Sequence, residues 1–324
     1  MTKTVFMTGG TGRIGKHILQ QLLALGYKVK VLVHNAEPED VSSDNLEIVR
    51  GDILDRNTFA DALEGCQFVC HLAAVFDMGA AIETDSENDY LFDHLIRGTS
   101  NVLEAARAVG TVELFEFASS DAVYCVIYKQ TNALITEEVE LTPRPGRYYA
   151  MAKATLESMC INYQKTYGLP YAVLRVGWCL DDDDVLDAFQ PGFWDSMYAP
   201  GEHDRLGGIH RDADYLIAPQ YENGEPGAVQ LAHSSDIASG FVLAIERQQQ
   251  AINQIINLSS DAPFKFHDCI EKVARGLNKP WEAVTLSGLG TYQISIDKAR
   301  RLLGYEPSYD IDRMIDVALA KRGA

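Results

Sequence analysis

Two side chains near the middle of the chain, Tyr149 and Lys153, have the types and the spacing needed to move a proton. Both lie in the stretch RYYAMAK, residues 147–153. This spacing is about one turn of an α-helix, so the phenol and the ammonium would share a helix face. A free phenol has a pKa of about 10, and a neighbouring ammonium lowers it toward the range useful for acid–base catalysis. An exposed surface helix would show the same spacing, so the surrounding sequence has to distinguish the two.

A glycine-rich stretch, TGGTGRIG (residues 8–15), follows the first apolar run and opens a helical pattern. Gly9, Gly12 and Gly15 allow a tight turn, a close approach of the backbone to a pyrophosphate, and close packing of helix on strand. The amino terminus of the helix adds amide donors and a partial positive charge. In this context the stretch predicts a dinucleotide-binding site.

The elements that would position these residues alternate along the first half of the chain. Predicted strands cover residues 3–9, 27–35, 45–52, 66–74, 112–120 and 169–177, with helices at 13–26, 60–65, about 90–109 and 149–167. The first helix has an apolar stripe of Ile14, Ile18, Leu22 and Leu25. Such alternation predicts an α/β fold with a parallel sheet covered on both faces. Periodicity is weak over 181–227, a segment with several aromatics that we interpret as a lid, and a helix, a strand and a helix follow at 236–246, 254–260 and 266–277.

Further motifs occur in order along the chain: GDILD with Asp52, HLAA (71–74), SSDAVY (119–124), LAHSSDIASG (231–240) and KARRLLGYEP (298–307). With the glycine stretch and the Tyr149–Lys153 pair, they make the chain resemble the extended short-chain dehydrogenases/reductases, the NAD-dependent epimerase/dehydratase family. The resemblance implies a Rossmann-type doubly wound parallel sheet built from residues 1–175 plus 229–258. A smaller substrate-binding lid and C-terminal part would comprise 176–228 plus 259–324.

The resemblance also implies roles for individual residues. Tyr149 would be the acid/base, Lys153 would lower its pKa and bind the nicotinamide ribose, and Ser120 would hold the substrate oxygen, with Ser119 as the alternative. The implied cofactor-binding residues are Gly9, Gly12, Arg13, Ile14, Gly15, His34, Asn35, Asp52, Ile53, Leu72, Ala73, Ala74, Tyr149, Lys153 and Val176. The implied substrate-binding residues are Phe76, Ser120, Asp121, Trp178, Phe193 and Trp194. No metal site is expected.

The end of the second predicted strand bears on the choice of cofactor. Family members that prefer NAD usually have an Asp where Val33 stands, and NADP-preferring members carry an Arg where His34 stands. With no carboxylate at Val33 to repel a 2′-phosphate, and with His34 and Arg13 to receive it, we expect NADP(H) to be favoured over NAD(H). His34 could equally be a solvated loop residue.

Other departures from the family pattern concern the substrate. Nucleotide-sugar members bind a diphosphate through an Asn and an Arg. In this chain Trp178 stands at the position of that Asn and Val229 at the position of that Arg. Losing an amide and a guanidinium favours an uncharged or cationic substrate over a doubly anionic one. Ala122 replaces the Glu of dehydratases, and Leu95 replaces the relay Asn.

Several polar residues invite a metal-site interpretation that the sequence does not favour. The run Asp181–Asp184 has no His or further acid at helical spacing, so we expect a solvated lid. His203 and His210 are predicted to face solvent in the lid. We expect His233 to satisfy backbone at the domain junction.

Bulk properties exclude some partners. The net charge of −18 over 324 residues argues against nucleic acid and anionic membranes. The absence of a long apolar run and of a signal pattern leads us to expect a cytoplasmic protein, and by family analogy a homodimer. We expect buried, reduced thiols at the six cysteines, Cys66, Cys70, Cys125, Cys160, Cys179 and Cys269.

Three hypotheses follow. The first is an NAD(P)-dependent oxidoreductase that interconverts an alcohol and a carbonyl on a small organic molecule. The second is a nucleotide-sugar epimerase, which Trp178 and Val229 disfavour. The third is a non-catalytic NADP-binding sensor, which would not need the Ser-Tyr-Lys set.

Overall fold

The computed structural model describes residues 3–39, 41–74, 89–124, 130–143, 148–182, 184–196, 214–286 and 289–323. Its centre is a sheet of seven strands in the order β12-β7-β5-β4-β1-β2-β3, and every neighbouring pair is parallel. The strands are β1 (Thr4–Thr8), β2 (Lys28–Val33), β3 (Leu46–Arg50), β4 (Phe68–His71), β5 (Leu114–Ser120), β7 (Tyr171–Val176) and β12 (Gln254–Leu258). The predicted α/β fold class, a Rossmann-type doubly wound sheet, is confirmed.

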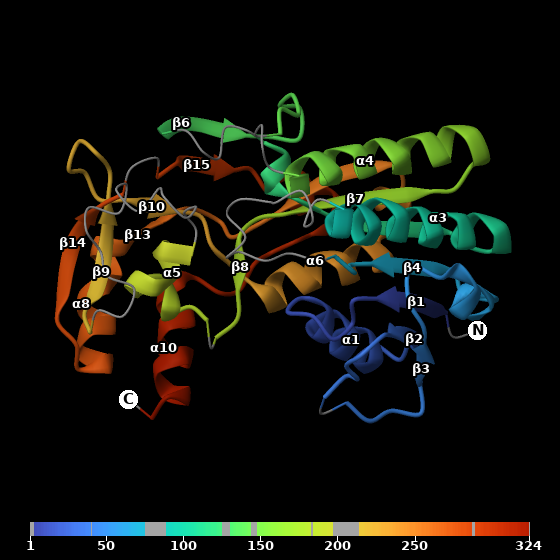
Figure 1. Cartoon of the computed structure of the whole chain (residues 1–324), viewed down its shortest axis with the longest axis horizontal. Coiled ribbons are helices and arrows are strands. Elements are labelled where there is room, and N and C mark those ends of the chain that lie inside the picture. The colour runs from blue at the N-terminus through green and yellow to red at the C-terminus, as the bar shows by residue number, and fades with distance from the viewer. Residues whose placement is uncertain are drawn as a thin grey trace.

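Helices cover both faces of this sheet (Figure 1). One face carries α3 (Gly98–Val109), α4 (Tyr148–Tyr167) and two 3₁₀ turns, Arg56–Thr58 and Ala60–Leu63. The other carries α1 (Gly15–Ala24), α6 (Ser234–Glu246), α7 (Gln248–Ala251) and α9 (Asp297–Leu303). Because both faces are covered, the central strands are apolar at successive positions instead of alternating with polar residues.

Strand β5 shows how one strand serves two cores. Its Phe115 and Phe117 pack with α3 and α4, whereas Leu114 and Ala118 pack with α1 and α6. The first helix differs from its predicted stripe at one position. Ile18 and Leu22 are buried, but Leu25, which follows the end of the helix at Ala24, is 56% exposed.

The helix predicted near residues 90–109 is confirmed with one irregularity. Its first part, Phe92–Arg97, is a π-helical turn that runs directly into α3. Such turns are uncommon in helices and occur frequently at functional sites. At the junction, a Cβ on Gly98 would lie 2.7 Å from Ile53, so glycine lets the loop after β3 pack directly on the helix.

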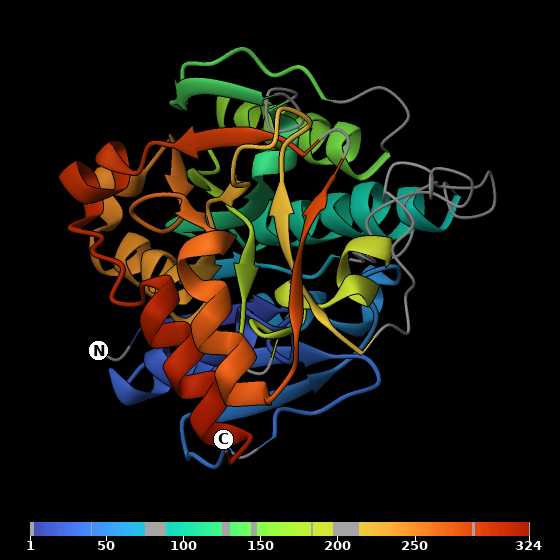
Figure 2. The same ribbon diagram turned by 90° about the vertical axis from the view of Figure 1, so that its left-hand side faces the viewer.

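The remaining elements form a second apolar cluster beside the sheet (Figure 2). It contains α8 (Phe266–Leu277) and α10 (Ile311–Lys321), which lie side by side, together with α5 (Pro191–Ser196). Three two-stranded ladders adjoin this part: β8 (Cys179–Leu180) with β11 (Ala232–His233), β9 (Leu216–Gln220) with β14 (Trp281–Thr285), and β10 (Ala228–Val229) with β13 (Phe264–Lys265). A further ladder, β6 (Gln130–Ile135) with β15 (Thr291–Ile294), packs separately against Val123 and Tyr124.

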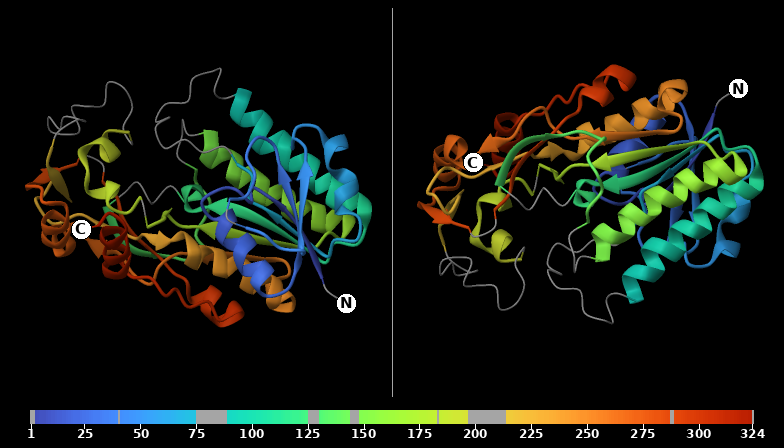
Figure 3. Two further views of the ribbon diagram at one scale, coloured as in Figure 1. Left: turned by 90° about the horizontal axis from the view of Figure 1, so that it is seen from below. Right: turned by 90° about the horizontal axis from the view of Figure 1, so that it is seen from above.

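The predicted domain boundaries remain predictions, and two contacts bear on them. Strand β12 lies at the edge of the central sheet, beside β7. In contrast, Ile296, Leu303 and Tyr305 pack in the core under the sheet although they were assigned to the capping part. Figure 3 shows the sheet with its helices at one end of the molecule and the second cluster at the other. No helix in the described ranges is long and apolar enough to cross a membrane.

Candidate active site

The glycine loop between β1 and α1 has a geometry that only glycine permits at two positions. Gly9 has a φ of +74°, and a Cβ there would lie 2.8 Å from the backbone nitrogen of Ala73. A Cβ on Gly15 would lie 2.0 Å from the carbonyl oxygen of Gly9. The loop is therefore folded tightly against the residues after β4, with the half-buried Ile14 at the N-cap of α1.

A buried polar chain fixes the loop that follows β4. The Nδ1 atom of His71 lies 2.7 Å from the Thr8 hydroxyl, and its Nε2 atom lies 2.9 Å from the Thr99 hydroxyl. Thr8 also accepts a hydrogen bond from the backbone N–H of Ala73 at 3.1 Å. Burial lowers the pKa of His71 to about 3, so its imidazole is neutral and structural. The three predicted cofactor residues Leu72–Ala74 are held here, with Ala74 exposed.

The predicted residues after β3, Asp52 and Ile53, are held by side chains that the sequence reasoning did not identify. Thr58 accepts from the backbone N–H of Asp52 at 2.9 Å, and Asn101 of α3 donates to the carbonyl of Ile53 at 2.8 Å. Nothing in the sequence marks Asn101 except its place three residues after Gly98 on the same helix.

Tyr149 and Lys153 lie in the first two turns of α4, facing β5. The Lys153 ammonium is 3% exposed and donates to the carbonyl oxygen of Ala118 at 2.6 Å. Its Nζ atom is 4.9 Å from the ring centre of Phe117 and 5.5 Å from that of Tyr149. Burial lowers the pKa of Lys153 to about 8, against the opposing attraction of Glu157. A lysine this buried is not part of an exposed surface face.

The structure separates the two serines at the end of β5. Ser119 is buried and donates to the Glu157 carboxylate at 2.5 Å. Ser120 is half-buried, accepts from the backbone N–H of Ala122 and donates to Asp121, both at 3.2 Å. Of the two serines, Ser120 is therefore the less buried one at the carboxyl end of β5, where it lies opposite Val176 in register.

Asp121 links this edge to the C-terminal part. Its second carboxyl oxygen accepts from the hydroxyl of Tyr292 in β15 at 3.2 Å. Burial raises the pKa of Asp121 to about 6, and hydrogen bonds from Ser120, Tyr292 and the backbone N–H of Trp178 oppose that shift. Sequence reasoning did not identify Tyr292, because its contact spans 171 residues.

A second buried network lies behind the predicted catalytic residues. Arg175 of β7 binds Glu157 through two hydrogen bonds, of 3.0 and 2.8 Å, and donates to the Tyr124 hydroxyl at 2.6 Å. Tyr124 in turn donates to Asn257 of β12 at 2.9 Å. The network connects α4, β5, β7 and β12, so it rigidifies the strand ends that carry Ser120 and Val176.

Three of the predicted substrate residues form one aromatic cluster. The Trp178 ring stacks on Phe193 with centres 5.6 Å apart, and it meets Trp194 edge-on at 6.2 Å. Trp194 is buried and its indole N–H donates to the carbonyl of Ala188. The indole nitrogen of Trp178 is buried without a hydrogen-bond partner in the described part of the chain. Phe76, His203 and His210 lie outside the described residues.

The end of β2 presents one buried and two exposed residues near the loop after β3. Val33 is 3% exposed and packs with α1, on the face of the sheet that also carries the glycine loop. His34 is the exposed residue there, with a 65% exposed side chain, and its Nε2 atom is 3.8 Å from Asp52. Asn35 is exposed next to it.

The residues that bind Arg13 lie on the opposite side of β1 from His34. Its guanidinium pairs with Asp184 at 2.7 Å and lies 3.4 Å from the carbonyl of Cys179 in β8. The segment with Cys179 and Asp184 follows β7, which lies on the opposite side of β1 from β2. The described contacts thus do not join Arg13 and His34 into one phosphate site.

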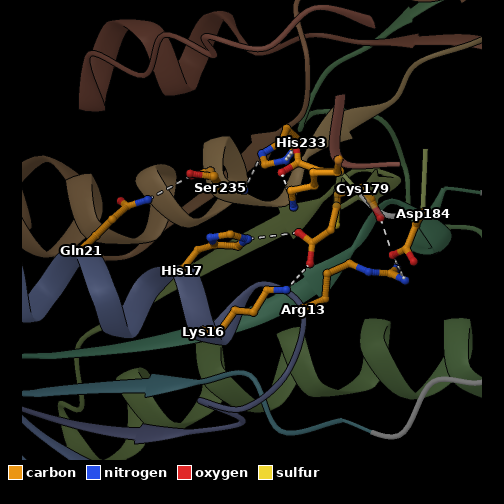
Figure 4. A network of polar contacts seen from close by, with 11 residues as sticks. Arg13, Lys16, His17, Gln21, Cys179, Asp184, His233 and Ser235 are labelled. Atoms are coloured by element: carbon orange, nitrogen blue, oxygen red, sulfur yellow. Dashed lines mark hydrogen bonds and ion pairs between the residues drawn. The ribbon is translucent and has the colours of Figure 1, made fainter. Parts of the chain in front are cut away.

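The acidic run after β8 was expected to be solvated, and that expectation was wrong for Asp181 and Asp182, whereas Asp184 (Figure 4) is 37% exposed and paired with Arg13. Asp181 is 14% exposed and pairs with Lys16 at 2.5 Å and with His17 at 3.1 Å, both in α1. Burial opposes ionisation of Asp181, but the hydrogen bonds from His17 and Lys16 outweigh it and lower its pKa.

His233 caps the N-terminus of α6, at the domain junction where we expected it to bond backbone groups. Its Nδ1 atom accepts from the backbone N–H of Ser235 at the start of α6, and its Nε2 atom donates to Asp182 at 3.0 Å. Asp182 also pairs with Lys321 of α10 at 3.0 Å. Burial lowers the pKa of His233, with Asp182 opposing the shift.

The donors present fit a dinucleotide. The glycine loop is closed too tightly for any side chain at Gly9 or Gly15, and it leads directly into the N-terminus of a ten-residue helix, where backbone N–H groups favour phosphate. The loops after β1, β3 and β4 meet at one edge of the sheet with Lys153 and Ser120. This fold and these loops define a Rossmann-type dinucleotide-binding protein.

Comparison with known proteins gives the family. The pattern that describes the NAD dependent epimerase/dehydratase family matches residues 5–178, and the chain belongs to that family. A relative in Sinorhizobium fredii, the uncharacterized protein y4nG, is 34% identical over 97% of this chain and 77% of its own length. L-arabinose 1-dehydrogenase (NAD(P)(+)) of Haloferax volcanii is 30% identical over 56% of this chain and 69% of its own length. A short-chain dehydrogenase/reductase superfamily protein of Agrobacterium tumefaciens, crystallised with bound NAD, superimposes with a TM-score of 0.83 and is 26% identical. The superposition covers 99% of this chain and 97% of that one.

Proposed function

We propose that this protein is an NAD(P)-dependent oxidoreductase that interconverts an alcohol and a carbonyl on a small organic substrate. The observation that carries the proposal is the position of Lys153. Its buried ammonium stands one helical turn from Tyr149, beside the strand that ends in Ser120. A buried lysine costs stability, and a role in tuning a neighbouring phenol gives a reason for retaining it.

The protein residues have separable roles. When bound, the nicotinamide ring supplies or accepts the hydride. Tyr149 exchanges a proton with the substrate oxygen, and Lys153 stabilises the phenolate form of Tyr149 electrostatically. An ammonium has three donors, so the bond from Lys153 to Ala118 leaves it able to bind a ribose hydroxyl as well.

Ser120 holds the substrate oxygen near Tyr149. Its hydroxyl donates to Asp121 and accepts from Ala122, so the side chain is kept in one orientation at the sheet edge. A fixed hydroxyl loses little entropy when it takes up a substrate hydrogen bond, which is how positioning residues favour reaction.

The substrate we infer is small and uncharged, with hydroxyl groups. Trp178 and Phe193 supply an aromatic wall at the position where nucleotide-sugar enzymes need amide and guanidinium donors. Asp121, which accepts from the backbone N–H of Trp178, would repel a diphosphate when it is ionised. The L-arabinose dehydrogenase among the relatives is compatible with this class of substrate.

The cofactor preference remains a prediction, NADP(H) over NAD(H). It is supported by the exposed His34, whose ring nitrogens lie at the end of β2. Two observations weaken it, because Asp52 lies beside His34 and Arg13 is paired with Asp184. The Agrobacterium tumefaciens neighbour was crystallised with NAD.

The test is a screen of sugars and small alcohols with NAD⁺ and NADP⁺, following absorbance of the reduced nicotinamide. We expect turnover by the wild type and a loss of about 10²-fold or more in Tyr149→Phe. Tyr148→Phe is the matched control, because it removes a hydroxyl from the neighbouring residue, and it should retain most activity. A nucleotide-sugar epimerase would convert its substrate without net change in absorbance. Dinucleotide binding without turnover by the wild type would support a binding protein, and equal turnover by the wild type and Tyr149→Phe would contradict the role of Tyr149.

We also propose that the protein is a homodimer through α3 and α4, which lie side by side on one face of the sheet (Figure 1). Met151 on α4 and Phe92 before α3 are each 48% exposed, and Tyr167 is 56% exposed. Light scattering after size exclusion should give twice the mass of the chain for the wild type. A wild type that is monomeric, with a mass that Met151→Glu leaves unchanged, would contradict this interface.

A further inference from the structure

The glycine loop of this chain carries a cation that is already paired. Arg13 lies between Gly12 and Ile14, and its guanidinium binds the Asp184 carboxylate at 2.7 Å and lies 3.4 Å from the carbonyl of Cys179 (Figure 4). Arg13 therefore spans from the predicted pyrophosphate loop to the segment that leads into the aromatic cluster. Nothing in the family roles described above uses this side chain in this way.

The acids of this segment fall into two groups by burial. Asp181 and Asp182 are 14% and 18% exposed, and each has two basic partners. They attach the segment to α1, α6 and α10. The Arg13–Asp184 pair is different. Its side chains are 40% and 37% exposed, and among the described residues the Asp184 carboxylate forms an ion pair with Arg13 alone. It is the member of the cluster that can separate without exposing a buried charge.

We propose that Asp184 competes with the dinucleotide pyrophosphate for Arg13, and so sets the affinity and the rate of cofactor binding. This inference rests on the proposed function, because it requires that the glycine loop bind a dinucleotide. An exposed ion pair contributes little, whereas a guanidinium binds phosphate oxygens through directional, charge-assisted hydrogen bonds. Exchange of Asp184 for the pyrophosphate as the partner of Arg13 is therefore favourable. Competition from the Asp184 carboxylate lowers the net free energy of cofactor binding.

A second consequence concerns the two halves of the molecule. Separation of Asp184 from Arg13 frees one end of the segment that runs to Phe193, while Asp181 and Asp182 keep it attached. Asp184 is thus a specificity-determining residue for dinucleotide affinity, and Asp181 is a structural attachment. Only the first should change cofactor affinity in the favourable direction when its charge is removed.

The experiment measures the Kd of NADH and of NADPH by fluorescence for the wild type, Asp184→Asn, Arg13→Gln and the double variant. Asp184→Asn should tighten binding about threefold, the size expected for an exposed ion pair. Arg13→Gln should weaken binding, and Asp184→Asn should have no effect in its presence. The gain in Asp184→Asn should shrink at high ionic strength, because exposed charges are screened.

Asp187→Asn is the matched control. Asp187 lies three residues further along and pairs with Arg322 at 3.3 Å, with side chains 47% and 39% exposed, so its loss removes the same charge without freeing Arg13. Equal affinities of Asp184→Asn and Asp187→Asn, or weaker binding by Asp184→Asn, would overturn the inference. A wild type that binds neither dinucleotide would instead overturn the proposed function. Both pairs are exposed, so all variants should melt at nearly the wild-type temperature.

Discussion

The ammonium of Lys153 donates to the carbonyl oxygen of Ala118 at 2.6 Å, which fixes the lysine against β5 two residues before Ser120. The bond joins the helix that carries Tyr149 to the strand that carries the substrate-holding serine. Because α4 and β5 are held together by a side chain that also titrates, the geometry and the charge of the site depend on one residue.

The first prediction concerns the pH dependence of carbonyl reduction. Burial lowers the pKa of Lys153 from 10.5 to about 8, so the ammonium is lost as the pH rises through that value. Reduction requires a protonated Tyr149 supported by a charged Lys153. We therefore expect kcat/KM, which reports the free enzyme, to fall above about pH 8. A profile that stays flat to about pH 10 would mean that Lys153 does not carry this role, and Lys153→Met should lose about 10²-fold or more in rate.

The second prediction concerns the buried pair of Glu157 and Arg175. Both side chains are almost fully buried, at 1% and 3% exposed, so removing one charge leaves the other uncompensated. Glu157→Gln should cost about 3–5 kcal/mol in the free energy of unfolding, measured with urea. Glu104→Gln, which breaks the half-exposed contact with Arg107, should cost about 1 kcal/mol or less.

The same variant tests the link to the active site. The Glu157 carboxylate raises the pKa of Lys153 against the larger effect of burial. Glu157→Gln should therefore move the alkaline limb of the kcat/KM profile to lower pH. An unchanged limb in a folded variant would show that the limb does not belong to Lys153.

Local signals in the sequence were sufficient for the sheet and for the loops that carry the cofactor site. The glycine loop, α4 and the strand ends at Asp52 and Ser120 depend on residues close together in the chain, and periodicity places them correctly. The burial of a residue at a strand end is harder to predict, as Val33 shows. Its burial depends on α1 packing under β2, which a single strand pattern does not reveal.

Long-range partners account for most of what the sequence could not give. The acids at Asp181 and Asp182 look like a solvated run because their partners, Lys16 and Lys321, lie far away in the chain. The contact of Tyr292 with Asp121 has the same character. Such pairs form because the two halves of the fold meet, and no local spacing encodes that meeting.

The third prediction uses the exposed end of β2 to test cofactor preference. His34→Asp places a carboxylate beside Asp52, where it should repel a 2′-phosphate and accept from ribose hydroxyls. The ratio of NADPH to NADH affinity should fall about tenfold, and His34→Arg should raise it by a similar factor. Gln250→Glu adds the same charge on α7, before β12 begins, and should leave the ratio unchanged. Identical ratios in all the variants would mean that His34 does not face the adenosine ribose.

The last prediction concerns Glu116, a carboxyl group buried in the middle of β5. Its side chain is fully buried, and its two oxygens have no hydrogen-bond partner in the described part of the chain. Burial raises its pKa well above 4.5, with a small opposing contribution from the Cys70 thiol, its register partner in β4. The folded protein therefore keeps a proton that the unfolded chain releases, and stability falls as the pH rises from about 4.5 toward the folded pKa.

Glu116→Gln removes this linkage because the amide does not ionise. The stability of the variant relative to the wild type should therefore increase by about 1.4 kcal/mol for each pH unit above about pH 5, until the wild-type carboxyl ionises in the fold. Urea unfolding at several pH values measures the difference directly. Glu113→Gln is the control, since this neighbouring carboxylate is exposed and paired with Lys3, and its effect should vary much less with pH. A constant difference between Glu116→Gln and the wild type would show that the Glu116 carboxyl ionises as readily in the folded protein as in the unfolded chain.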